Sequence, residues 1–187
     1  MNAIRRTRGL HVVATFDDGP HPERTPRVLD LLAASGARAV FFVVGRNAER
    51  RPDLLRRIRD EGHAIGNHTW SHPVMPLRST RTIEDELDRC QAIVTSVTGS
   101  SPTLARPPYG LGGRRYYAAL EERNLTPVLW SLDSRDYLGT AASRLAARLG
   151  RAGAGDIVLM HDGDPKARHL LDALDRWFRS KPAVGLL

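Results

Sequence analysis

Two adjacent carboxylates, Asp17 and Asp18, end an apolar run and stand just before Gly19 and Pro20. The run Val12–Phe16 predicts a buried strand, and the Gly-Pro pair predicts the turn that ends it. Neighbouring residues on a flat strand point to opposite faces, but at a turn both carboxylates can face one site. Two ionised carboxylates repel, so one tends to take up a proton unless a metal ion or an arginine is near. The pair indicates a cation site, with the alternative that one aspartate caps a turn and the other is solvated.

Two histidines four residues apart, His68 and His72, lie in a polar stretch after a short predicted strand. At this spacing, on a turn or a helix start, both imidazoles can bind one cation. A carboxylate would make a third ligand and leave the remaining positions open to water and substrate, which is typical of a catalytic metal site. Two histidines and one carboxylate also hold non-haem iron for oxygen chemistry, so the spacing alone leaves that alternative open. Ordinary loop histidines are the simpler alternative.

Three later predicted strands also run into ionisable side chains. These side chains are Arg106, then Asp133 and Asp136, then His161. Each has an ordinary explanation by itself, such as a surface arginine or a helix cap. In a parallel sheet, however, the carboxyl ends of the strands meet at one edge, so we expect these side chains to converge with the aspartates and histidines.

Strands and helices alternate six times along the chain, with short connections. The predicted strands cover residues 12–16, 39–44, 63–66, 102–105, 127–132 and 156–160, and the predicted helices cover residues 26–35, capped by Thr25, and 52–61, 80–97, 114–123, 141–149 and 166–179. This alternation predicts an α/β fold with a mostly parallel sheet. The chain is short for a full eightfold barrel, so we expect a distorted, incomplete (β/α) barrel with parallel strands. No linker divides it, which predicts a single domain over residues 1–187.

Composition narrows the class of protein. A chain of 187 residues with 41% hydrophobic and 26% charged residues is typical of one globular domain. The net charge is +7, but the densest basic run, residues 50–59, reads as the solvated face of one helix and is not interleaved with aromatic residues. We therefore expect no nucleic-acid partner. Cys90 is the only cysteine, which rules out an intrachain disulfide and favours a small buried residue.

No stretch is long enough for a signal peptide or a membrane span. We therefore expect no membrane association and a cytoplasmic location. A secreted protein whose leader had been removed would look the same.

Five motifs in order resemble those of the polysaccharide deacetylases, carbohydrate esterase family 4, also called the NodB homology domain. They are Thr15–Pro20, His68–His72, Arg106–Gly110, Asp133–Tyr137 and Leu159–Asp162. The resemblance spans nearly the whole chain, and its first two motifs are the most specific. The fourth motif usually ends in tryptophan but ends here in Tyr137, which changes how this wall contacts a sugar.

The resemblance implies a distorted (β/α) barrel and metal-dependent removal of N-acetyl groups from amino sugars. Asp18, His68 and His72 would bind one divalent ion, zinc first, with cobalt or another divalent ion as a substitute. Asp17 would be the general base, His161 the general acid and the backbone N–H of Tyr109 a donor to the oxyanion. Arg106 would hold Asp17, and Asp136 would hold either Arg106 or His161. Each step of amide hydrolysis thereby has a candidate residue.

Two other functions stay open at this point. An acetylxylan esterase removes O-acetyl groups with the same kind of site, and a carbohydrate-binding pseudoenzyme keeps the fold with an inert site. We expect a monomer acting on an N-acetylated carbohydrate. The absent secretion signal and Tyr137 in place of tryptophan favour a soluble N-acetylglucosamine-containing substrate of a few rings.

Overall fold

The structure, a computed structural model, describes residues 2–180 and 183–187. Within these residues one sheet of eight strands forms the centre, and its strand pairings are parallel. The order is β5-β4-β3-β2-β1-β7-β6, and β8 pairs with β1. The strands are β1 (Val12–Asp17), β2 (Val40–Val43), β3 (Ala64–Asn67), β4 (Leu104–Ala105), β5 (Thr126–Pro127), β6 (Leu132–Asp133), β7 (Ile157–His161) and β8 (Val184–Gly185).

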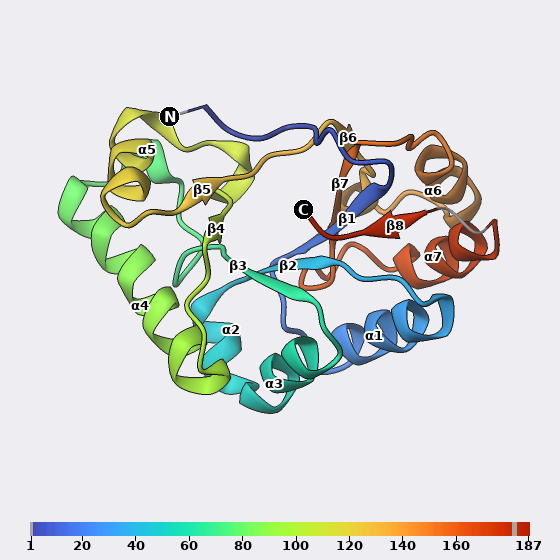
Figure 1. The fold of residues 1–187 in the computed structure, drawn as a ribbon, viewed down its shortest axis with the longest axis horizontal. Coiled ribbons are helices and arrows are strands. Elements are labelled where there is room, and N and C mark those ends of the chain that lie inside the picture. Colours follow the sequence, from blue (N-terminus) through green and yellow to red (C-terminus); the bar gives the residue numbers. More distant parts are fainter. Residues whose placement is uncertain (1, 181–182) are drawn as a thin grey trace.

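Helices surround this curved sheet on its outer side (Figure 1). They are α1 (Arg24–Ser35), α2 (Gly45–Arg50), α3 (Pro52–Asp60), α4 (Thr80–Thr98), α5 (Gly113–Glu122), α6 (Ala142–Leu149) and α7 (Leu170–Arg179). Three short 3₁₀ helices, η1 (Met75–Leu77), η2 (Pro108–Gly110) and η3 (Asp136–Leu138), lie in the loops. β5 and β6 end the strand order without pairing with each other in the described residues. The predicted fold class, an incomplete barrel with parallel strands, is confirmed.

Both faces of the central strands are buried, which explains their continuous apolar runs. Along β1, Val12, Ala14 and Phe16 join the cluster under the outer helices, while Val13 points into a second cluster inside the curved sheet. Phe16 stacks on Phe41 of β2 with ring centroids 5.1 Å apart. The strands that carry the site are therefore fixed by packing on both sides.

The N-terminal segment bridges the opening of the barrel. The N–H of Ile4 donates to the Pro127 carbonyl at 2.9 Å, and the Ile4 carbonyl accepts from the N–H of Leu129 at 2.8 Å. Further along, the N–H of Thr7 donates to the Gly155 carbonyl at 2.8 Å, just before β7. The segment thus links β5 to the start of β7 across the opening, as its path across the top of Figure 1 shows.

Several predicted element boundaries are wrong. The strand predicted at 127–132 is two strands, β5 and β6, because β5 pairs with β4 at one edge of the sheet and β6 pairs with β7 at the other. The intervening residues have to cross the opening. The helix predicted from Lys166 begins at Leu170, since residues 166–169 form turns. Neither α2 nor β8 was predicted.

The predicted cap of α1 is also wrong. Glu23 is the N-cap, and Thr25 lies inside the helix, buried, where its Oγ1 accepts from the N–H of His21 at 2.7 Å and contacts Asp162. Ser79 is the N-cap of α4, and its side chain accepts from the N–H of Thr82. Cys90 is buried, as expected, and burial raises the pKa of its thiol to about 12.

Across residues 2–180 and 183–187, no helix combines the length and the apolar character that crossing a membrane requires.

Candidate active site

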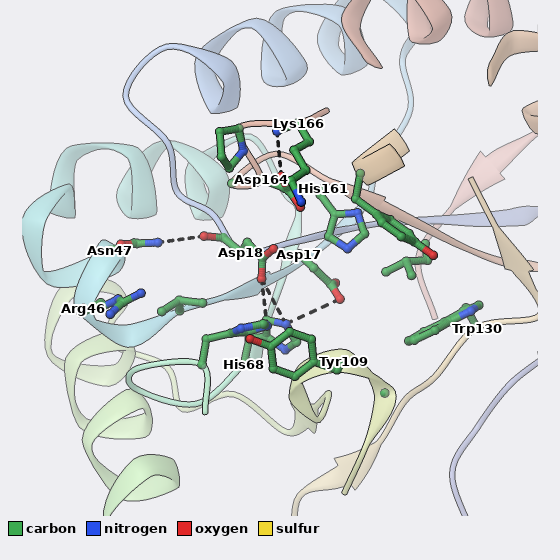
Figure 2. Close-up of a pocket in the computed structure, with 17 residues that line it drawn as sticks. Asp17, Asp18, Arg46, Asn47, His68, Tyr109, Trp130, His161, Asp164 and Lys166 are labelled. Atoms are coloured by element: carbon green, nitrogen blue, oxygen red, sulfur yellow. Dashed lines mark hydrogen bonds and ion pairs between the residues drawn. The ribbon is translucent and has the colours of Figure 1, made fainter. Parts of the chain in front are cut away.

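A cavity of about 580 Å³ opens at the carboxyl ends of the parallel strands. Figure 2 shows the residues that line it, with Asp17, Asp18 and His161 at its centre. Of the residues singled out in the sequence, those that line the cavity are Asp17, Asp18, His68, His72, Tyr109, Tyr137 and His161. Arg106 and Asp136 lie behind its wall, with exposed fractions of 0% and 1%. Asp133 is half-buried and accepts from the Tyr137 hydroxyl at 3.0 Å.

A backbone turn lets both adjacent carboxylates reach this cavity. Asp17 ends β1, whereas Asp18 has a φ of 73°, in the left-handed region that L residues rarely occupy. The loop after β7 presses against this turn at Gly163, where a Cβ would lie 2.2 Å from the Asp18 backbone. Asn47 also holds it, because its Nδ2 donates to the Asp18 carbonyl at 2.8 Å. Asp17 and Asp18 therefore do not alternate between faces as neighbours on a strand do, because contacts from two sides hold the turn at Asp18.

Asp18, His68 and His72 form a group that fits one metal ion. Their ligand atoms lie within 4.8 Å of one another. Asp18 Oδ1 is 3.4 Å from His68 Nε2 and 3.2 Å from His72 Nε2, yet it is buried without a hydrogen-bond partner in the described residues. The other ring nitrogen of His68, Nδ1, lies 2.8 Å from the Arg106 carbonyl, which favours the N–H there and leaves Nε2 free as a ligand.

The protonation states of this group suit a cation. Burial raises the pKa of Asp18, but the nearby imidazole of His68 and the charges of His72 and His161 outweigh it, so its pKa lies below the ordinary value. Burial and the charge of His68 lower the pKa of His72 to about 4. Burial alone would lower the pKa of His68, but the charges of Asp17 and Asp18 raise it. A divalent ion among these side chains would replace the proton that the two carboxylates draw onto His68.

Asp17 is held by a buried arginine. Arg106 Nη1 donates to Asp17 Oδ1 at 2.7 Å and to Thr15 Oγ1 at 2.7 Å. Its Nε and Nη2 donate to the carbonyls of Val128 and Leu129, both at 3.1 Å. Burial lowers the pKa of the guanidinium, while the charge and hydrogen bond of Asp17 oppose this. Because Arg106 uses Asp17 Oδ1, the other carboxylate oxygen, Oδ2, is the one left for chemistry.

Asp136 contacts His161 and not Arg106, which decides between the two partners that the sequence left open. His161 Nδ1 lies 2.8 Å from Asp136 Oδ1, and the His161 N–H donates to Asp136 Oδ2 at 2.7 Å. Ser134 Oγ also donates to Asp136 Oδ1, at 2.9 Å. Burial lowers the pKa of His161, but the hydrogen bond and charge of Asp136, with the charges of Asp17 and Asp18, raise it to about 9.

Base and acid candidates are neighbours on adjacent strands. Asp17 and His161 are directly paired in the register between β1 and β7. Tyr109 lies on the other side, with a φ of 60° and its ring 4.6 Å from that of His72. In the part of the chain that the structure describes, no acceptor is found for the backbone N–H of Tyr109. One cavity thus holds three side chains that could bind a metal ion, the Asp17 carboxylate oxygen that Arg106 does not use, the His161 imidazole and the backbone N–H of Tyr109.

Sequence reasoning missed three kinds of cavity residue. Trp130 faces the cavity from the crossing between β5 and β6, as Figure 2 shows, but the sequence predicts it inside a strand. Arg46 and Asn47 belong to α2, which was not predicted. Lys166 belongs to the turns that were predicted as helix. Of these residues, only Trp130 could have been placed near the cavity from the sequence, because it stands just before the fourth motif.

Comparisons with known proteins agree with this geometry. Residues 5–128 match the family profile described as polysaccharide deacetylase. A peptidoglycan-N-acetylglucosamine deacetylase from Bacillus cereus is 37% identical over 169 residues, covering 88% of this chain and 61% of that protein. A chitooligosaccharide deacetylase from Bradyrhizobium sp. is 37% identical over 183 residues, covering 93% of this chain and 84% of the relative.

A crystal structure of a peptidoglycan N-acetylglucosamine deacetylase superposes with a TM-score of 0.90 at 33% identity, covering 96% of this chain and 86% of the other. The resemblance predicted from the five motifs is confirmed. The profile match ends before the last two motifs, Asp133–Tyr137 and Leu159–Asp162, whose placement at the cavity comes from the structure.

Proposed function

The chain belongs to the polysaccharide deacetylase family, and on that premise we propose that it hydrolyses N-acetyl groups of N-acetylglucosamine-containing oligo- or polysaccharides with one divalent metal ion. The observation that carries the proposal is the unpartnered buried Oδ1 of Asp18 between two imidazole nitrogens, in the same cavity as Asp17 and His161. The named activities of the relatives support the same bond type.

Asp18, His68 and His72 would hold the ion. When bound, a divalent ion lowers the pKa of a coordinated water and polarises a carbonyl. Two imidazoles and one carboxylate with open positions are ligands that zinc takes at catalytic sites, so we propose zinc, with cobalt or another divalent ion as a substitute. The iron alternative uses neither the second carboxylate nor His161.

The remaining steps fall to the chain's own residues. Asp17 Oδ2 accepts the proton of the attacking water as the water oxygen bonds to the acetyl carbon. Arg106 orients Asp17 for this step by donating to its Oδ1. The backbone N–H of Tyr109 donates to the oxyanion of the tetrahedral intermediate. His161, protonated and oriented by Asp136, gives a proton to the leaving nitrogen from Nε2 as the carbon–nitrogen bond breaks, which yields a free amine and acetate.

Released acetate tests the proposal directly. Zinc-loaded protein is incubated with N-acetylglucosamine oligomers, with peptidoglycan fragments and with acetylated xylan. Acetate from the N-acetylated sugars supports it. Turnover of acetylated xylan alone would assign the esterase function, and no turnover with any metal would assign an inert carbohydrate-binding domain.

Two variants separate the proposed roles. Asp17→Asn keeps the metal ligands, so we expect one zinc per chain and a kcat lower by ~10²–10⁴-fold. His72→Ala removes a ligand, so metal and activity should be lost together. Equal metal content in wild type and His72→Ala would overturn the ligand assignment. The monomeric state and the cytoplasmic location stay predictions, tested by light scattering and by cell fractionation.

A further inference from the structure

A second cavity continues the catalytic one past a shared wall. It has a volume of about 520 Å³ and is lined by Tyr137, Leu138, Gly139, Lys166, Arg168 and His169. Tyr137 and Lys166 line both cavities. Each volume falls within the range of ~300–1,000 Å³ that is common for small-molecule sites. A chain of sugars with one ring in the catalytic cavity therefore has room for a neighbouring ring in the second.

The shared wall is fixed to the catalytic residues. The Tyr137 hydroxyl donates to Asp133 Oδ2 at 3.0 Å, and its backbone N–H donates to Asp136 Oδ1 at 3.0 Å. The Tyr137 ring meets the His161 ring edge-on, with centroids 5.3 Å apart. A sugar in the second cavity would thus lie against the residue that separates it from the general acid.

The opposite wall is a short segment between β7 and α7 that presents two cations. The N–H of Lys166 donates to Asp164 Oδ1 at 2.7 Å, and the N–H of Ala167 donates to the Asp164 carbonyl at 3.1 Å. Ala167 is buried with an exposed fraction of 1%, whereas Lys166 and Arg168 on either side of it are exposed. This anchoring places both basic side chains along the second cavity.

These cations are not neutralised by the protein. Among residues 2–180 and 183–187, neither Lys166 nor Arg168 has an ion-pair partner, and no carboxylate lines the second cavity. The first cavity differs, because Asp17, Asp18 and Asp164 line it. The second cavity therefore attracts a negatively charged group, whereas the catalytic cavity itself carries negatively charged side chains.

We propose that this second cavity is a subsite for a sugar ring that carries a carboxylate, next to the N-acetylated ring being hydrolysed. Lys166 and Arg168 bind the carboxylate by charge-assisted hydrogen bonds, and the exposed Leu138 contacts the apolar face of the ring. The proposal rests on the proposed deacetylase function and specifies its substrate class as an acidic N-acetylated glycan.

The test compares three tetrasaccharides: neutral N-acetylglucosamine tetramer, a peptidoglycan tetrasaccharide whose lactyl groups carry carboxylates, and the same tetrasaccharide with these carboxylates converted to methylamides. We expect the Lys166→Gln/Arg168→Gln double variant to lower kcat/KM on the carboxylated glycan, relative to its methylamide, by about 5- to 30-fold, mainly through KM, as expected for two solvent-accessible ion pairs. The wild-type preference should weaken as sodium chloride is added.

Arg56→Gln is the matched control, because Arg56 is exposed on α3, away from both cavities, and should leave the preference unchanged. Equal kcat/KM of the wild type on the carboxylated and methylamide glycans, or an equal loss on both in the double variant, would overturn the subsite.

Calorimetric binding of the two glycans gives a result even without turnover. Tighter binding of the carboxylated form by the wild type but not by the double variant supports the subsite when no acetate is released, and in that case only the deacetylase function has failed. Equal binding overturns the subsite whatever the activity.

Discussion

Two carboxylate–cation pairs flank the catalytic cavity, and they differ in whether the cation can lose its proton. Asp17 pairs with Arg106 at 2.7 Å, and the side chains are 4% and 0% exposed. Asp136 pairs with His161 at 2.8 Å, and the side chains are 0% and 13% exposed. The distances are nearly equal, but a guanidinium stays charged throughout the working pH range, while an imidazole titrates.

Because of this difference, the two pairs have similar geometry but opposite roles. The fixed charge of Arg106 holds Asp17 Oδ1 in place and leaves Oδ2 open to the cavity. The carboxylate of Asp136 raises the proton affinity of His161 but leaves Nε2 facing the cavity, so its proton can be given away. In the first pair the guanidinium of Arg106 positions the Asp17 carboxylate for chemistry. In the second pair the carboxylate of Asp136 positions the His161 imidazole.

Removing the titrating member should have the largest effect on rate. We expect His161→Ala to lower kcat by ~10²–10⁴-fold with one metal ion per chain retained, because a general acid is lost while the ligands remain. Steady-state kinetics and metal analysis check this. His11→Ala, at the opposite end of β1, is the control and should keep full activity. A His161→Ala variant with near wild-type kcat would show that the leaving group takes its proton from elsewhere.

Removing the fixed member should act on stability as well as on rate. We expect Arg106→Met to lower the free energy of unfolding by about 3–5 kcal/mol, because Asp17 would be left as an unpaired buried charge. Urea unfolding followed by tryptophan fluorescence measures it. Arg56→Met, an exposed control on α3, should change the free energy by less than about 0.5 kcal/mol. If Arg106→Met lowers the free energy of unfolding by less than about 1 kcal/mol, leaving Asp17 without its arginine costs little free energy and the prediction is contradicted.

Changing only the carboxylate of the titrating pair should move a pH limb. The raised pKa of His161, about 9, keeps the imidazolium populated at neutral pH, so kcat/KM should fall as pH rises through the alkaline limb. A divalent ion offsets the charge of Asp18, so in loaded protein that limb should lie below pH 9. Asp136→Asn removes the main group that raises the pKa, so the limb should shift to lower pH and kcat at pH 8 should fall by about tenfold. A full pH–rate profile with an unmoved limb would contradict this.

The smallest expected effect concerns Tyr137, whose ring meets the His161 ring edge-on at the wall of the catalytic cavity. Tyr137→Trp restores the larger ring face and should lower KM for chitooligosaccharides by about 2- to 5-fold with kcat nearly unchanged. Tyr137→Phe is the matched control, because it removes only the hydroxyl that donates to Asp133. If both variants raise KM equally, the hydroxyl and its hydrogen bond matter more than the area of the ring.

The convergence of Asp17, His68 and His161 was predictable, because parallel strands bring their carboxyl ends to one edge whatever the details of packing. The partner of Asp136 was not, since arginine and histidine both suit a carboxylate and sequence separation carries no orientation. The division of residues 126–133 into β5 and β6 depends on which sheet edge each end joins, a tertiary fact that local periodicity does not contain. Trp130 was missed for the same reason.

The central place of β1 in the sheet has a consequence for how the chain folds. β1 is made first but pairs with β7, and the Thr15 hydroxyl donates to the Val158 carbonyl 143 residues away. Closing a loop of that length costs about 4 kcal/mol of chain entropy before any contact rewards it, and such long-range pairing slows folding. Asp18, His68 and His72, by contrast, all emerge within the first 72 residues. During synthesis the three proposed ligands are therefore available long before His161 can join Asp17, so we expect the metal site and the proposed proton-transfer pair to form at different times.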